Sequence, residues 1–88
     1  MTALVTGAGK RLGREMALFL ARRGHDVAVH YASSRDEAEA TAAEICALGR
    51  RAQTFSADLL KEEQVQALIP AVTAALGPLT VLVNNASI

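Results

Sequence analysis

The sequence predicts an α/β fold: a doubly wound parallel sheet of four strands in the order 3-2-1-4, with helices on both faces. One observation is that short apolar runs of strand length alternate with longer segments whose apolar residues recur at helical spacing. A second is that glycines, and the dipeptide Gly77-Pro78, stand between these segments. Strands that alternate with helices form βαβ units, and their right-handed crossovers generate a parallel sheet.

The first unit runs from a strand at residues 3–5, through a glycine-rich turn at 6–13, into an amphipathic helix. Gly24 suits the left-handed conformation that ends a helix, and residues 27–31 form the second strand. The apolar residues expected on the inner face of this helix are Leu12, Met16, Phe19 and Leu20.

The second helix follows the loop at residues 32–35, where Ser33 or Ser34 can cap it, and it ends before Gly49. Residues 52–56 form a weaker strand, and its polar positions predict a place near an edge of the sheet. The residues expected on the inner face of the second helix are Ala38, Ala42, Ile45 and Leu48.

The third helix opens with Glu62 and Glu63, and a strand at residues 79–83 follows it. This strand is almost continuously apolar, which predicts burial on both faces, as in a central parallel strand. With no further strand beside it, its edge would be bare, so we expect the 88 residues to be incomplete as a monomer. The apolar residues at helical spacing in the third helix are Val65, Leu68, Ile69, Val72 and Leu76.

The composition fits one small domain: 88 residues, of which 51% are apolar and 3% aromatic, enough for a core of small aliphatic side chains. The formal net charge is zero, so nothing indicates nucleic acid or a membrane surface as a partner. Cys46, the single cysteine, is expected to be a buried or half-buried small hydrophobe. No signal peptide or membrane-spanning run is recognised, which favours a cytoplasmic location. No metal site is predicted, because no group of ligand residues has metal-binding spacing.

The glycine-rich turn carries the functional signal. Strand, glycine turn and helix together form an arrangement that binds phosphate, because glycines permit close approach and the helix N-terminus presents free N–H groups. No Gly-Lys-Ser/Thr follows, which excludes a kinase-type phosphate loop, and Gly13 falls one residue late for the G-x-G-x-x-G fingerprint. A tight turn that binds nothing is the alternative.

The turn resembles the T-G-x-x-x-G-x-G motif of the short-chain dehydrogenase/reductase family. Thr6, Gly7 and Gly13 match it, and Arg11 stands at the middle glycine, as in the pteridine reductase branch. Asp58-Leu59 resembles the family's adenine-contacting Asp, and residues 84–87 resemble its N-N-A-G motif in the form N-N-A-S. The resemblance implies the N-terminal half of a Rossmann sheet (β-α-β-α-β-α-β). Residues 1–88 would then be a partial NADP-binding domain without the catalytic C-terminal half.

The resemblance also assigns contacts to single residues. Asp58 would accept from the adenine amino group beside the Leu59 backbone, although an Asp in this position also often caps a helix. Asn84 and Ala86 would line the ribose, and Ser87 would approach the nicotinamide, although paired Asn residues also often form a turn. The pyrophosphate would lie against Gly7, Gly13 and the backbone of Arg11 and Leu12.

The end of the second strand predicts which dinucleotide is bound. An acidic residue there would select NAD, but Asp26 begins the strand, and no carboxylate stands among residues 30–35. An arginine beside hydroxyl groups suits a 2′-phosphate, so we expect NADP(H). The alternative is that the arginines are solvated and the serines only cap a helix. The residues expected near the 2′-phosphate are Arg11, His30, Tyr31, Ser33, Ser34 and Arg35.

The family's catalytic residues, a Ser and a Y-x-x-x-K motif, have no counterpart in this chain, since Tyr31 is followed four residues later by Arg35. The expected function is therefore the cofactor-binding half of an NADPH-dependent oxidoreductase that transfers hydride to a carbonyl or a pterin-like C=N. The resemblance implies a small-molecule substrate and a homotetramer when complete. The alternative is a non-catalytic NADP(H)-binding module that associates through its exposed sheet edge.

Overall fold

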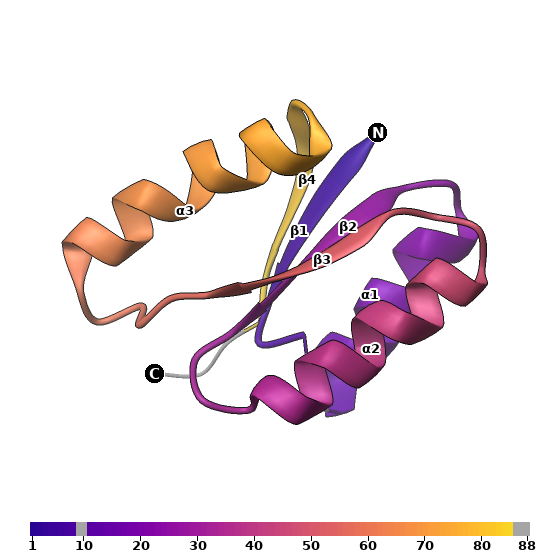
Figure 1. The fold of residues 1–88 in the computed structure, drawn as a ribbon, viewed down its shortest axis with the longest axis horizontal. Coiled ribbons are helices and arrows are strands. Elements are labelled where there is room, and N and C mark those ends of the chain that lie inside the picture. The colour runs from indigo at the N-terminus through magenta and orange to yellow at the C-terminus, as the bar shows by residue number, and fades with distance from the viewer. Residues whose placement is uncertain (9–10, 86–88) are drawn as a thin grey trace.

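A four-stranded parallel sheet in the order β3-β2-β1-β4 organises the chain, as the computed structural model of residues 1–8 and 11–85 shows (Figure 1). The predicted strand order is confirmed. The elements in chain order are β1 (Thr2–Thr6), α1 (Arg11–Arg22), β2 (Asp26–Tyr31), α2 (Arg35–Ala47), β3 (Ala52–Ser56), α3 (Glu62–Leu76) and β4 (Leu79–Asn84).

The helices lie on both faces of the sheet, α1 and α2 on one and α3 on the other (Figure 1). The period of two in a strand sends alternate side chains of β1 into two cores. Val5 packs with Val29 under α1 and α2, whereas Leu4 packs with Ala28 and with Val72 of α3. Both cores are apolar, and the burial of their apolar surface is the main contribution that holds the three layers together.

Helix α1 buries only part of the face that its sequence predicts, since Met16 and Leu20 are half-buried against the core. Its buried residues are the small Gly13, Ala17 and Ala21 together with Leu18, so the helix lies close to the sheet. Leu12 is 60% exposed and Phe19 is 52% exposed, and the prediction that they face the core is wrong. Small residues occupy the face of α1 that contacts the sheet, because a helix that approaches a sheet closely leaves room only for small side chains.

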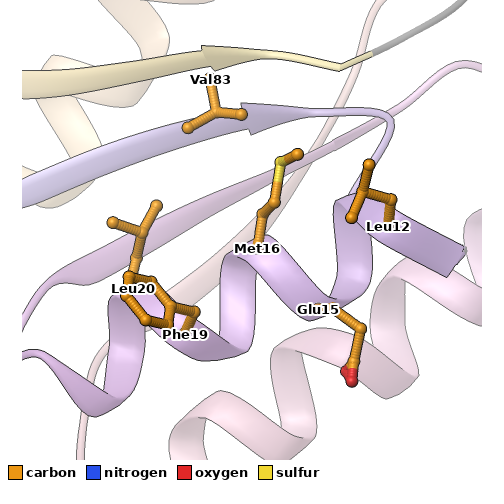
Figure 2. Close-up of a pocket in the computed structure, with 6 residues that line it drawn as sticks. All are labelled: Leu12, Glu15, Met16, Phe19, Leu20 and Val83. Carbon is orange, nitrogen blue, oxygen red and sulfur yellow. The ribbon is translucent and has the colours of Figure 1, made fainter.

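The displaced apolar side chains of α1 line an open groove of about 410 Å³ beside β4. Figure 2 shows Leu12 and Met16 pointing from α1 toward the sheet, where Val83 of β4 forms the opposite wall, while Glu15 points away. Phe19 and Leu20 complete the apolar lining.

Strand β4 lies at the edge of the sheet, and its residues alternate between half-buried and exposed. Leu82 is 58% exposed, so the predicted burial of this strand on both faces is wrong for the described residues. The prediction of an edge position for the third strand is confirmed. Cys46 is exposed rather than buried, and Leu48, Val65 and Ile69 are exposed at positions predicted to face inward.

The amino end of the sheet is held by an ion pair between Asp26 and Arg51. Asp26 Oδ1 accepts from the Arg51 main-chain N–H at 3.0 Å, and Oδ2 accepts from the guanidinium at 2.9 and 3.1 Å. The same guanidinium donates to the Leu76 carbonyl at 2.9 Å and so joins β2, β3 and the end of α3. The hydrogen bond from the Arg51 N–H is the main cause that lowers the pKa of Asp26 below its ordinary value near 3.8. This carboxylate therefore has a structural role at the edge opposite to the strand ends where a cofactor would bind.

We expect Asp26→Asn to lower the free energy of unfolding by about 1 kcal/mol at pH 7. Because the pKa of Asp26 is lower in the folded chain, its stabilisation is present above the unfolded pKa and is lost as the pH falls through the folded pKa. Urea unfolding at pH 7 and at pH 3 should show the difference between wild type and variant shrinking in acid. Glu63→Gln, which removes an exposed carboxylate, is the control, and a difference that grows in acid would contradict this role of Asp26.

Candidate dinucleotide site

The candidate site lies at the carboxyl ends of the strands, where β1 and β4 meet. All pairings are parallel, so these ends share one edge of the sheet (Figure 1). The chain leaves β1 toward the face covered by α1, and it reaches β4 from α3 on the other face. Ligands of doubly wound sheets bind in the crevice where the connections change faces in this way.

The turn after β1 is held from below by β2. Gly7 has a φ of +64°, a conformation that glycine adopts without strain. Its N–H donates to Nδ1 of His30 at 3.1 Å, and the Ala8 N–H donates to the His30 carbonyl at 3.0 Å. The first two N–H groups of the turn are therefore already engaged. Gly7 therefore contributes its conformation to the predicted anion site, but its N–H is not available to bind the anion. The prediction that the pyrophosphate lies against Gly7 then concerns only the close approach that a residue without a side chain allows.

Gly13 lets the start of α1 lie directly against this turn. A Cβ at position 13 would lie 2.1 Å from the Gly7 carbonyl oxygen and 2.6 Å from Nδ2 of Asn85. Only glycine permits that approach. Because the first N–H groups of an α-helix have no partner within the helix, those of Arg11, Leu12 and Gly13 can receive an anion.

Arg11 opens α1 in the left-handed region, with a φ of +49°. This conformation costs a residue with a side chain about 1 kcal/mol and explains why glycine would suit the position. The side chain of Arg11 is exposed, as is that of Leu12. Within residues 1–8 and 11–85, its guanidinium has no hydrogen-bond or ion-pair partner.

The end of β4 is bonded to the same turn. The Asn85 N–H donates to Oγ1 of Thr6 at 2.9 Å, and the Asn85 side-chain Nδ2 lies 3.4 Å from the Gly7 carbonyl. Oγ1 of Thr6 lies 3.2 Å from Oδ1 of Asn84. Two stretches 78 residues apart are thus brought together, as the site prediction requires. Ala86 and Ser87, predicted at the ribose and the nicotinamide, lie outside the described residues.

Thr6 and Asn85 were not among the predicted site residues. The sequence could have indicated them, because Thr6 precedes Gly7 and Asn85 follows Asn84, and both neighbours are predicted site residues. Their contacts connect the two motifs to each other rather than to a ligand, and such contacts need a tertiary structure to be seen.

The end of β2 leaves its hydroxyl groups available. Ser34 occupies the cap position of α2, with φ −93° and ψ 61°, but its side chain makes no cap hydrogen bond. The alternative that its hydroxyl is used up as a helix cap therefore does not hold. Ser33 and Arg35 are exposed beside it, whereas Tyr31 is half-buried against the core under α1 and α2.

His30 is placed differently from its prediction. The side chain is 1% exposed, and its Nε2 lies 2.9 Å from the Ala57 carbonyl while Nδ1 accepts from Gly7. Both ring nitrogens are thus occupied by main-chain groups. His30 supports the turn from beneath, and the predicted direct contact with a 2′-phosphate is corrected.

Asp58 lies in the loop after β3, half exposed. Its Oδ1 accepts from the Leu60 N–H at 3.0 Å, and its own N–H donates to Oε1 of Gln64 at 2.7 Å. Its Oδ2 has no hydrogen-bond partner within the described parts of the chain and can accept from a ligand. Leu59 is half-buried beside it.

Residues 1–8 and 11–85 contain neither a candidate metal site nor a candidate membrane-spanning helix. No group of three or more His, Cys, Asp or Glu side chains there could hold a metal ion. None of the helices in these residues has the length and apolar character required to cross a membrane.

Comparison with known proteins identifies relatives along the full length of the chain. Residues 1–88 match the family described as short chain dehydrogenase. The 3-oxoacyl-(acyl-carrier-protein) reductase FabG of Staphylococcus epidermidis is 46% identical over 99% of the chain, which spans 36% of that protein. The short-chain dehydrogenase/reductase homolog YusS of Bacillus subtilis is 44% identical over 98% of the chain, and there the matched region is 79% of the protein. The chain thus spans about a third of the first relative and most of the second.

A solved structure matches the fold. A short chain dehydrogenase from Burkholderia cenocepacia in complex with NADP superposes with a TM-score of 0.94 at 44% identity. The match covers 98% of this chain and 35% of that one.

The contact between Gly13 and Gly7 gives a direct test of the site's construction. We expect Gly13→Ala to lower the free energy of unfolding by about 3 kcal/mol or more, because the new methyl group meets main-chain atoms that cannot move aside cheaply. Thermal and urea unfolding of the chain measure this loss.

Gly49→Ala is the matched control. Its φ of +86° imposes strain, but nothing lies within 4 Å of the added Cβ, so the cost should be about 1 kcal/mol. Equal stability of the two variants would show that α1 does not lie against the turn.

Proposed function

Because the chain belongs to the short chain dehydrogenase family, we propose that its 88 residues form the NADP(H)-binding part of an NADPH-dependent reductase. The observation that carries this proposal is the contact of Gly13 with the Gly7 carbonyl, which places the free N–H groups of α1 over the turn after β1. A pyrophosphate is the group that such an N-terminus accepts. The NADP complex of the Burkholderia cenocepacia relative supports the same assignment.

NADP(H) is proposed over NAD(H) because of what stands at the end of β2. The nearest carboxylate on this strand, Asp26, is at the opposite end and is paired with Arg51. The hydroxyl of Ser34 makes no cap hydrogen bond, and Arg11 and Arg35 are exposed. Hydroxyl and guanidinium donors suit a 2′-phosphate dianion better than a free 2′-hydroxyl. The next carboxylates along the chain, Asp36 and Glu37, follow these residues and belong to the first turn of α2.

The remaining contacts of the cofactor stay proposals. Asp58, whose Oδ2 has no hydrogen-bond partner among the described residues, would accept from the adenine amino group beside the Leu59 backbone. Asn84 would lie at the ribose with Ala86, and Ser87 at the nicotinamide. Tyr31, half-buried at the end of β2, would flank the adenosine.

The proposed reaction is hydride transfer to a carbonyl or a pterin-like C=N, and the nicotinamide supplies the hydride when bound. The residues that bind the substrate, the catalytic Ser and the Y-x-x-x-K motif would belong to sequence that these 88 residues do not contain. The name of the FabG relative, a 3-oxoacyl reductase, favours a ketone. Arg11 and the N-N-A-S motif are the features that favour a pterin-like substrate. A cytoplasmic location and a homotetrameric whole protein complete the proposal.

A second function is favoured by the length of one relative. The matched region covers 79% of YusS, so the family includes a chain not much longer than this one. The chain would then be a non-catalytic NADP(H)-binding module that associates through the bare edge of β4, where Leu82 is exposed and the groove of Figure 2 opens. It differs from the first proposal in binding NADPH without any reductase activity.

Reversing the charge of Arg11 tests the choice of cofactor. We expect Arg11→Glu to weaken NADPH binding by about 10- to 100-fold and to leave NADH binding within about threefold, because only NADPH carries the 2′-phosphate. Titration by cofactor fluorescence measures both affinities.

Arg50→Glu makes the same charge change in the loop after α2, at the opposite edge of the sheet, and should leave both affinities unchanged. Unaltered NADPH and NADH affinities in Arg11→Glu would overturn the assignment of this arginine.

A further inference from the structure

We propose that His30 is a positioning residue, which fixes the glycine turn for the pyrophosphate by accepting the Gly7 N–H as a neutral, Nε2-protonated imidazole. This inference deepens the proposed function and depends on it for its purpose. The residue is among the largest side chains that are fully enclosed in the described parts of the chain. Its position in β2 places the ring between the turn after β1 and the segment that follows β3.

The two partners of the ring determine its tautomer. The Gly7 N–H can only donate, so Nδ1, at 3.1 Å from Gly7 N, must be the unprotonated nitrogen. The Ala57 carbonyl can only accept, so Nε2, at 2.9 Å from it, must carry the proton. An imidazolium would direct an N–H at the Gly7 N–H, and the other neutral tautomer would lose both hydrogen bonds.

The main chain of the same residue adds a second contact with the turn. The His30 carbonyl accepts from the Ala8 N–H at 3.0 Å, so consecutive N–H groups of the turn are directed at one residue of β2. Both donors therefore point down into the sheet. The anion is left to the N–H groups at the start of α1, which Gly13 holds against the Gly7 carbonyl on the other side of the turn.

The turn is thus held between three groups. The Gly7 N–H is bound by His30, the Gly7 carbonyl lies 3.4 Å from the Asn85 amide, and the φ of +64° fixes the direction between them. Without an acceptor at Nδ1, a buried N–H would lose its partner and the peptide before Gly7 would be free to rotate. The proposed consequence is a turn that no longer presents α1 to the pyrophosphate.

Two amide substitutions, each of which reproduces the position of one ring nitrogen, separate the hydrogen bond to Gly7 from the contact with Ala57. In His30→Asn the side-chain oxygen can replace Nδ1, but the side chain is too short to reach Ala57. In His30→Gln the longer amide can reach Ala57 but leaves the Nδ1 position empty. We expect His30→Asn to bind NADPH within about threefold of wild type and His30→Gln to bind about tenfold more weakly, while both lose similar stability. Equal weakening in both variants, in proportion to their loss of stability, would reduce His30 to a structural residue and overturn the proposal.

The tautomer itself is measured on the wild-type chain without cofactor. A long-range ¹H–¹⁵N spectrum at pH 7 should show one neutral, Nε2-protonated imidazole for His30, with His25 as the internal comparison. Hydrogen exchange of the Gly7 amide should be slow in wild type and in His30→Asn, and fast in His30→Gln. An Nδ1-protonated or charged ring, or a Gly7 amide that exchanges fast in wild type, would overturn the proposal.

These readouts separate the two proposals. If the wild-type chain does not bind NADPH, the proposed function fails, and the role proposed for His30 at this cofactor falls with it. If NADPH binds and the tautomer differs, only the role of His30 fails.

Discussion

The close approach of Gly13 in α1 to the Gly7 carbonyl is the constraint on which the rest of the site depends. It sets where α1 begins and directs the unpaired N–H groups of that helix over the ends of β1 and β4. It also requires the turn to have one conformation, which His30 from β2 and Asn85 after β4 hold from two sides. Three elements far apart in the sequence therefore converge on one peptide unit. An anion site built from main-chain groups needs this rigidity, because the N–H groups must be fixed before the ligand arrives.

The amino and carboxyl edges of the sheet, where the strands begin and where they end, use their polar groups differently. At the amino edge the charged groups are satisfied within the protein, as the bidentate pair of Asp26 with Arg51 and the contact of Arg51 with Leu76 show. At the carboxyl edge polar groups are left unused: the hydroxyl of Ser34 caps no helix, and one oxygen of Asp58 lacks a partner in the described residues. Unused polar groups cost a fold little where water reaches them, and they are the groups that a dinucleotide can bind.

Much of this organisation could be predicted from the sequence. Alternating strand and helix patterns predict the sheet order, and the place of Asp26 at the start of its strand excludes it from the cofactor site. Three expectations differ from the structure, because periodicity does not say how closely two elements approach or which side of a sheet or helix a residue faces. The apolar side of α1 was expected to bear Leu12 and Phe19, but small residues occupy the contact with the sheet. His30 was expected to face the ligand, yet a strand residue can point to either side of its sheet. Cys46, expected inside, is exposed because α2 buries only the stripe formed by Ala38, Thr41 and Ile45.

NADPH is proposed to bind at the carboxyl ends of the strands, over the turn after β1. The most direct measurement is a titration of the ¹⁵N-labelled chain with NADPH, followed by amide chemical shifts. We expect the shifts to concentrate at Leu12 and Gly13 and at Ser34 and its neighbours, while the amides of the loop around Gly49, at the opposite ends of the strands, keep their shifts. Shifts confined to those opposite ends, or no shifts at millimolar NADPH, would contradict this placement of NADPH.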